Sequence, residues 1–150
     1  IRLADLARRS GDITAEKQHL RAGLEIDAMS FDPAARLTML AVVTDDPKNL
    51  AVALERAVAI APLHPITLGA QALQAARAGD KARAGALGKR ALKGVEDTEG
   101  RGPADTLVVL ALASEAADDL TTAKILATRA AAEKGLPAPA KQAMDRITGG

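Results

Sequence analysis

Few residues in this chain are of the types that catalyse reactions or bind metals. His19 and His64 are the only histidines, and neither has a carboxylate or a second histidine four residues away, as a helical zinc site requires. The absence of cysteine excludes disulfides, thiolate nucleophiles and cysteine-bound zinc. We therefore expect both histidines to be structural or surface residues, and we expect no metal and no cofactor.

Two pairs of adjacent aspartates, Asp45-Asp46 and Asp118-Asp119, could act as a general acid and a general base. Each pair directly precedes a predicted helix, however, where an aspartate caps free backbone N–H groups and complements the helix dipole. No serine lies in a nucleophile elbow, and the glycines form no phosphate-binding loop after a strand. We interpret the aspartates as helix caps and expect that the chain is not an enzyme.

The composition favours helices around an aliphatic core. Hydrophobic residues make up 48% of the 150 residues, and Phe31 is the only aromatic residue. Small residues let helices approach closely, and we expect such packing at Gly69, Gly85 and Gly88. No segment alternates with period two, so we predict no strand. The longest apolar run, residues 106–117, is shorter than the roughly 20 residues that span a membrane.

Helix-start and helix-stop residues divide the chain into helical segments. Asp32-Pro33 and Asp46-Pro47 each place an N-cap before a proline at the first helical position. A polar loop is predicted at residues 95–102. The predicted helices cover residues 1–9, 13–28, 33–43, 47–61, two helices within 65–93 hinged at Gly79-Asp80, and then 104–117, 120–134 and 138–147.

A helix pair recurs along the chain at nearly constant spacing. The helix pairs can be aligned on one small residue late in each second helix, and these anchor residues are separated by 35, 34 and 39 residues. Seven residues, or about two helical turns, before each anchor lies another small or apolar residue on the same helix face. The anchors are Ala22, Ala57, Ala91 and Ala130, and the upstream positions are Ala15, Leu50, Ala84 and Ala123.

With the Gly79-Asp80 turn, the Ala91-Leu92 pair and Pro62, this periodicity resembles the tetratricopeptide repeat family. The first helices lack the large aromatic residues usual in that family, which leaves other α-solenoids and a plain helical bundle as alternatives. We predict an all-α single domain over residues 1–150: an α-solenoid of about four antiparallel helix-turn-helix repeats with a C-terminal capping helix. The repeats cover about 1–30, 31–64, 65–98 and 103–136, and the cap covers 137–148.

The resemblance implies a concave groove, lined by the first helices, that binds a peptide or a partner helix. The lysine-asparagine clamp of chaperone-binding family members is missing. Met39, Leu73 and Leu112 should be more exposed than their core neighbours Leu37, Leu68 and Leu110. The positions that would line the groove are Ala35, Met39, Val42, Ile66, Leu73, Arg77, Val108, Leu112 and Glu115.

We therefore expect a protein-protein interaction or scaffolding module for an apolar peptide segment or a partner helix. The alternative is a structural domain that packs on another copy in a homo-oligomer, or on a domain upstream of Ile1, where we expect further sequence. A formal charge of +1 gives no reason to expect nucleic acid. A local basic cluster could contact an anionic lipid or an acidic protein, although the acids at 96, 97 and 99 favour a solvated face. The cluster comprises Arg83, Lys89, Arg90 and Lys93.

Overall fold

The computed structural model describes residues 2–96 and 104–149, and in these ranges the chain is helical, without a strand. The prediction of an all-α fold is therefore confirmed, while most of the predicted loop at 95–102 lies outside the described residues. Within those residues no helix has the length and apolarity needed to cross a membrane. The helices are α1 (Arg2–Ser10), α2 (Ile13–Ile26), α3 (Phe31–Val43), α4 (Pro47–Ile60), α5 (Pro65–Arg77), α6 (Lys81–Glu96), α7 (Ala104–Ala116), α8 (Leu120–Ala131) and α9 (Ala138–Thr148).

The predicted start of α3 at Pro33 is wrong, because the helix begins at Phe31 after Ser30. Pro33 therefore lies in the first turn, where its missing N–H removes no intrahelical hydrogen bond. Asp32 does not cap the helix but adds a negative charge to its first turn, where the helix dipole stabilises it. The predicted proline starts at Pro47 and Pro65 are confirmed.

Four turns, each between a pair of antiparallel helices, share one geometry. The first residue of each turn is left-handed, with φ of 77°, 51°, 83° and 63°, and the following aspartate N–H donates to a carbonyl five residues earlier at 2.9 Å. The aspartate Oδ1 then accepts the N–H three residues later at 3.0 to 3.2 Å. The interpretation of the paired aspartates as caps is therefore confirmed for Asp46 and Asp119, whereas Asp45 and Asp118 form the left-handed turns instead. The turns are Gly11-Asp12, Asp45-Asp46, Gly79-Asp80 and Asp118-Asp119.

These turns correct the predicted register of the first helix pair by one residue. Ala57, Ala91 and Ala130 each follow a left-handed residue by twelve positions and are 0% exposed. The same count from Gly11 leads to Gly23 instead of Ala22, which is exposed. Seven residues before Gly23 lies Glu16, so a carboxylate occupies the position that Leu50, Ala84 and Ala123 fill elsewhere.

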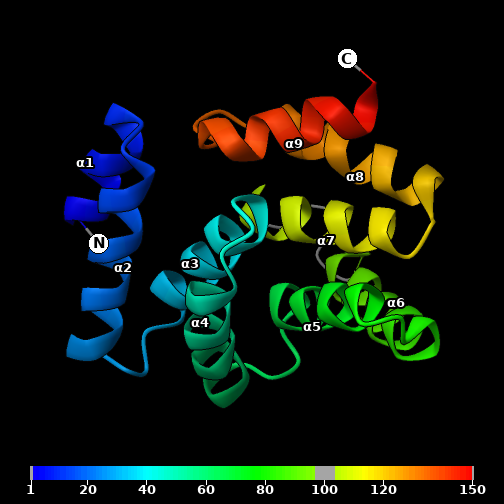
Figure 1. Ribbon diagram of the computed structural model, residues 1–150, viewed down its shortest axis with the longest axis horizontal. Coiled ribbons are helices and arrows are strands. Elements are labelled where there is room, and N and C mark those ends of the chain that lie inside the picture. The colour runs from blue at the N-terminus through cyan, green and yellow to red at the C-terminus, as the bar shows by residue number, and fades with distance from the viewer. Residues whose placement is uncertain (1, 97–103, 150) are drawn as a thin grey trace.

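Helix α7 lies at the centre of the larger part of the molecule, between α9 and the α5–α6 pair (Figure 1). Residues 106–113 are all buried, as expected of a helix that is apolar on every side. It contacts α3, α5, α6, α8 and α9. The helix-helix contacts fit a helical repeat, but α3 also reaches α7 and α9, beyond its neighbours in the chain.

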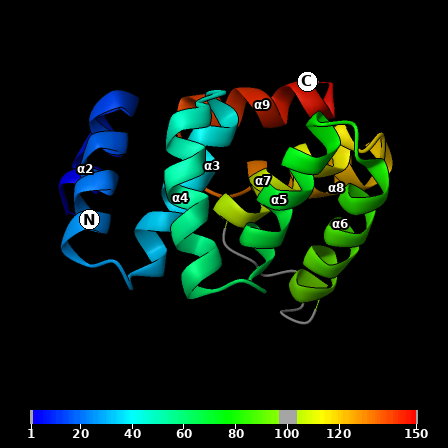
Figure 2. The same ribbon diagram turned by 60° about the horizontal axis from the view of Figure 1, so that its bottom comes forward.

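The α1–α2 pair lies at one end of the molecule, beside α3 and α4 (Figure 2). Lys17 on α2 connects it to the next turn, because its Nζ donates to Thr44 Oγ1 at 2.7 Å and to Asp46 Oδ2 at 2.9 Å. The hydrogen bonds from Lys17 and then Asn49 lower the pKa of Asp46 to about 2. The cap of α4 therefore also binds the first helix pair to the second.

The expectation of close packing at three glycines holds at only one of them. A Cβ built on Gly69 would lie 2.6 Å from Leu110 Cδ2 and 3.4 Å from Val109 Cγ1, so α5 and α7 touch there. A Cβ on Gly85 or Gly88 would meet nothing within 4 Å, so the expectation is wrong for both. These two glycines therefore face open space.

This difference predicts opposite effects of the same substitution. Gly88→Ala should raise the free energy of unfolding by about 0.5–1 kcal/mol, since alanine favours the helix and meets no neighbour. Gly69→Ala should lower it by about 1 kcal/mol, because the new Cβ displaces the Leu110 side chain and crowds Val109. Urea denaturation of both variants checks this. Equal shifts of the midpoint would contradict the α5–α7 contact at Gly69.

Candidate functional site

Most of the residues predicted to line a concave groove are buried. Met39, Ile66 and Val108 are 0% exposed, Val42 and Leu73 are below 4%, and Leu112 is 8% exposed. Ala35 and Glu115 are half-buried, and only Arg77 is exposed. A residue at 0% exposure cannot contact a partner in this conformation, so the continuous groove along the first helices is not present.

The predicted order of exposure is also wrong for two of the three pairs of residues. Met39 and Leu37 are both 0% exposed, and Leu73 at 2% is less exposed than Leu68 at 5%. Only Leu112, at 8%, exceeds Leu110, at 1%. The physical reason is that α7 and α9 pack on α3, and α7 packs on α5, so the first helices bury one another's inner faces.

Three of the predicted groove residues nevertheless line one surface pocket of about 630 Å³, which we call the α9 pocket. Val42 comes from the end of α3, Arg77 from the end of α5 and Leu112 from α7. Helix α9 forms the opposite wall. The remaining lining residues are Val43, Asp45, Pro139, Gln142, Ala143 and Arg146.

The α9 pocket has a mainly polar lining, which includes two guanidinium groups, with a smaller apolar part. Arg146 donates from Nη1 and Nη2 to the two carboxylate oxygens of Glu115 at 2.6 and 2.9 Å, and these hydrogen bonds raise the pKa of Arg146. Arg77 Nη1 lies 3.8 Å from Asp45 Oδ1, in a pair whose side chains are 46% and 92% exposed. Such an exposed ion pair contributes little to the free energy of folding, so Arg77 keeps hydrogen-bond donors free for another acceptor.

Sequence reasoning missed the wall that α9 supplies to this pocket. The helix itself was predicted, but only as a terminal cap. No local pattern places Ala143 or Arg146 beside Val42, which lies about a hundred residues earlier in the chain. Of the lining residues that were missed, Asp45 stood out in the sequence, but only as the first of two aspartates that precede a helix.

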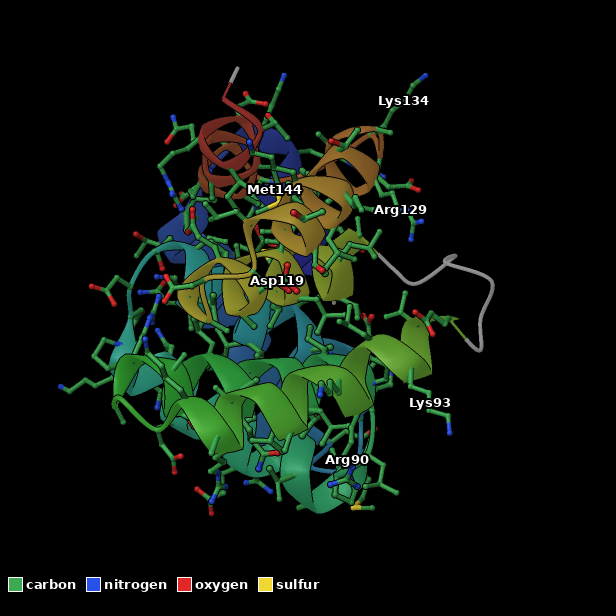
Figure 3. The ribbon with its side chains drawn as sticks, turned by 90° about the vertical axis from the view of Figure 1, so that its right-hand side faces the viewer. Arg90, Lys93, Asp119, Arg129, Lys134 and Met144 are labelled. Atoms are coloured by element: carbon green, nitrogen blue, oxygen red, sulfur yellow. The ribbon has the colours of Figure 1, made fainter. Side chains whose placement is uncertain are left out.

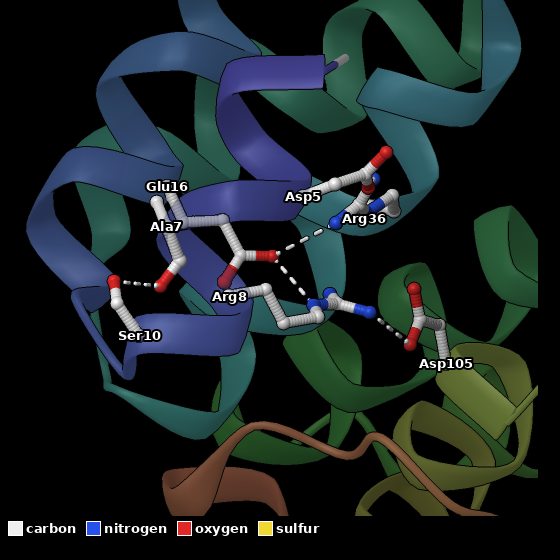
Figure 4. Close-up of polar contacts among 7 residues, drawn as sticks. All are labelled: Asp5, Ala7, Arg8, Ser10, Glu16, Arg36 and Asp105. Atoms are coloured by element: carbon white, nitrogen blue, oxygen red, sulfur yellow. Dashed lines mark hydrogen bonds and ion pairs between the residues drawn. The ribbon is translucent and has the colours of Figure 1, made fainter.

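A buried cluster of charges joins α1, α2, α3 and α7 (Figure 4). Glu16 is 0% exposed, and its Oε1 accepts from Arg8 Nε at 2.6 Å and from Arg36 Nη2 at 3.2 Å. Arg36 Nη1 also donates to Asp5 Oδ1 at 2.6 Å, and Arg8 Nη1 lies 3.7 Å from Asp105 Oδ1. Two arginines therefore connect three carboxylates from three helices.

Opposite charges stabilise the cluster, while the burial of its charged groups costs free energy. Burial opposes the charge of Arg36, but the hydrogen bond and charge of Asp5 and the charge of Glu16 outweigh it and raise the Arg36 pKa. Burial raises the pKa of Asp105 against the opposing charges of Arg8 and Arg36. Glu16 Oε2 and Arg36 Nε are buried without a hydrogen-bond partner among the described residues. These features fit a structural connection between helices better than a reactive site.

The two histidines do not form a catalytic or metal site with other described residues. His64 Nδ1 accepts the N–H of Ile66 at 3.1 Å and so caps α5, which confirms its structural interpretation. Its ring lies 4.6 Å from that of Phe31, and burial lowers its pKa. His19 is half-buried on α2. No group of three or more potential metal ligands occurs in residues 2–96 and 104–149.

The basic cluster predicted on the second helix of the third pair lies on α6. Arg83, Lys89, Arg90 and Lys93 are all exposed, and none makes an ion pair with another described residue. Lys81, at the start of α6, lies 3.5 Å from Asp118 at the turn between α7 and α8. Among the described residues the cluster therefore has no anionic partner, and none of its four members lines the α9 pocket.

The buried cluster predicts a large cost for removing one charge. Glu16→Gln keeps the shape of the side chain but leaves Arg8 and Arg36 without their shared carboxylate, so the free energy of unfolding should fall by about 3 kcal/mol. Glu25→Gln, at an exposed position on the same helix, should change it by less than about 0.5 kcal/mol. Guanidinium denaturation at pH 7 measures both. Similar midpoints would mean that Glu16 does not balance the two arginines.

Comparison with known proteins gives no relative for this chain. No family model matches it, and neither does any curated protein or solved structure. Its function is therefore inferred from the geometry and chemistry of its own residues.

Proposed function

We propose that this chain is a tetratricopeptide-like helical repeat that binds peptide segments of other proteins and is not an enzyme. The four equivalent turns, two of them glycine-first and two aspartate-first, support four hairpins of an α-solenoid with α9 as the terminal cap. In this proposal the array curls until α3 meets α7 and α9. The inner faces of the first helices then become core, and the ligand site moves to their ends.

The observation that carries the proposal is the origin of the residues in the α9 pocket. Val42, Arg77 and Leu112 come from the first helices of three successive hairpins and meet at one opening of about 630 Å³. A site assembled from several repeats is the usual arrangement in this architecture, in which stacking creates a shared binding surface. The volume is also within the range of known ligand pockets.

The chemistry of the lining suggests which peptides would bind. Val42, Leu112 and Ala143 offer apolar contact to one aliphatic side chain. Arg77 is only weakly paired with Asp45, so its planar guanidinium can donate two parallel hydrogen bonds to a carboxylate. The expected ligand is a short peptide segment with an aliphatic residue close to an aspartate, a glutamate or a free C-terminus.

A charge reversal in the pocket tests this function. Peptides are selected against the protein from a library of random 12-residue sequences, and their dissociation constants are measured by fluorescence anisotropy. Arg77→Glu should weaken the binding of the selected peptides by at least about tenfold, because it removes a pair of hydrogen-bond donors and repels the peptide carboxylates. Enrichment of an aliphatic residue beside an acidic one is expected among them.

The matched control is Arg21→Glu, a charge reversal at an exposed position on α2, outside the α9 pocket. It should change the affinities by less than about twofold, as expected of a remote surface charge at moderate ionic strength. Both variants should melt close to the temperature of the wild type, because the contacts that they remove, Arg77 with Asp45 and Arg21 with Asn49, are exposed. If Arg77→Glu binds the peptides with unchanged affinity, the α9 pocket is not the binding site.

A second candidate function, packing against another copy of the chain, is favoured by exposed apolar side chains on the first helix pair. Leu3 and Leu6 on α1 are 60% and 59% exposed, and Ile26 at the end of α2 is 88% exposed. Leu3 and Leu6 are three residues apart and so share one face of α1, and an exposed apolar patch is typical of an interface. None of these residues lines the α9 pocket, so the two functions can be separated.

Sedimentation velocity over a range of protein concentrations distinguishes the two candidates. The binding module should sediment as a monomer at every concentration. A dimer that dissociates in the Leu3→Gln and Leu6→Gln double variant would favour self-assembly through α1, because a polar side chain at those exposed positions removes the apolar contact without disturbing the core.

A further inference from the structure

An unfilled apolar slot runs between α6 and α7, on the side of the molecule away from α1 and α2. Ala84, Gly85 and Gly88 line it from α6, and Leu110, Ala113 and Ala117 line it from α7 and the turn that follows. Its volume is about 180 Å³. An apolar cavity of about 150 Å³ can hold a benzene ring, so the slot has room for one large aliphatic or aromatic side chain.

The slot exists because small residues on α6 leave space beside α7. A Cβ added to Gly85 or Gly88 would meet no atom within 4 Å, so α6 does not use its glycines to approach α7. Glycine within a helix costs about 1 kcal/mol relative to alanine, and here no close contact compensates for that cost. The two glycines keep the slot open.

The chain itself has no aromatic side chain that could fill the slot. Phe31 is the only aromatic residue, and its ring packs 4.6 Å from that of His64 at the N-terminal ends of α3 and α5. An aromatic side chain in the slot must therefore come from another molecule.

The charges around the slot indicate the chemistry of that molecule. Helix α6 carries five basic residues and one acidic residue, and α8 carries two basic residues and none acidic. The two helices thus have a formal charge of +6 in a chain whose formal charge is +1. Figure 3 views this side, with Asp119 between the two helices, Arg129 and Lys134 above, and Arg90 and Lys93 below.

We propose that the slot between α6 and α7 docks an acidic protein segment, which inserts one aromatic or large aliphatic side chain while its carboxylates meet the basic residues of α6. Lys89 and Asp119 both lie on the wall of the slot, and Asp119 accepts the N–H of Thr122 as the cap of α8. Neither Lys89 nor Arg90 forms an ion pair within the described part of the chain. Complementary charge speeds association and selects the partner, and the buried side chain supplies the specific anchor. The slot and the α9 pocket share no lining residue.

The probe is a set of acidic 12-residue peptides in which a single Phe, Trp or Leu stands among aspartates and glutamates, with a matched set that has Ala at that position. Binding is followed by titration of the ¹⁵N-labelled protein up to millimolar peptide. The aromatic or leucine peptides should bind at least about tenfold more tightly than the alanine peptides and shift the amide signals of Gly85 and Gly88.

Two variants separate the anchor from the charge. Gly88→Leu fills the slot from an open helix position, so it should fold normally and reduce the difference between the peptide sets to less than about twofold. Lys89→Glu should weaken the binding of both peptide sets, and Arg21→Glu should weaken the binding of neither. Because Arg77→Glu alters only the α9 pocket, it should leave this binding unchanged, so failure here and failure of the peptide-binding function are distinguishable.

Several outcomes would overturn the docking site. Equal affinity for both peptide sets, an undiminished difference in Gly88→Leu, or no binding at millimolar peptide would each do so. Vesicles containing phosphatidylserine serve as the competing probe. If the protein binds them and the Lys89→Glu variant does not, while neither peptide set binds, the basic face is a lipid contact instead.

Discussion

The contact of α7 with α5 at Gly69 and Leu110 is the constraint on which the rest of the molecule depends. A helix that is apolar on every side must be surrounded, and α7 is enclosed by α3, α5, α8 and α9. Enclosing it uses the inner faces of the first helices, which an open array would have left free for a ligand. Pockets beside α7 then lie near the C-terminal ends of the first helices, between α6 and α7, and at the N-terminal end of α7, where Asp105 and Thr106 contribute to the lining.

Those parts of the fold that depend on local chemistry could be predicted from the sequence. Aspartates after a glycine or another aspartate end one helix and cap the next, and prolines at Pro47 and Pro65 start helices, so most helix bounds follow from neighbouring residues. The register of the first pair could not, because Glu16 takes a place that aliphatic residues fill in the other pairs. Apolar periodicity does not detect a buried carboxylate whose partners, Arg8 and Arg36, lie on other helices.

The candidate site was predictable only in part, for a related reason. Val42 and Arg77 lie at the C-terminal ends of α3 and α5, and Leu112 lies about one turn before the end of α7, so the sequence pattern placed all three in the C-terminal halves of first helices. Whether Met39 or Leu73 is exposed depends instead on how far the array curves, which is decided by contacts between helices distant in the chain. On α7, Leu110 and Leu112 are two residues apart, yet the first lines the slot and the second lines the α9 pocket. One buried helix thus forms part of both surfaces.

The left-handed turns differ in one respect that concerns ionic strength. Glycine adopts this conformation freely, whereas an L-residue such as Asp45 or Asp118 pays up to about 1–2 kcal/mol for it. Both aspartates face a cation of the neighbouring hairpin, since Asp45 lies 3.8 Å from Arg77 and Asp118 lies 3.5 Å from Lys81. These pairs are exposed, so added salt screens them while the backbone cost remains. The backbone cost of the two aspartate turns is therefore largely uncompensated at any ionic strength, whereas the turns at Gly11 and Gly79 do not have this cost.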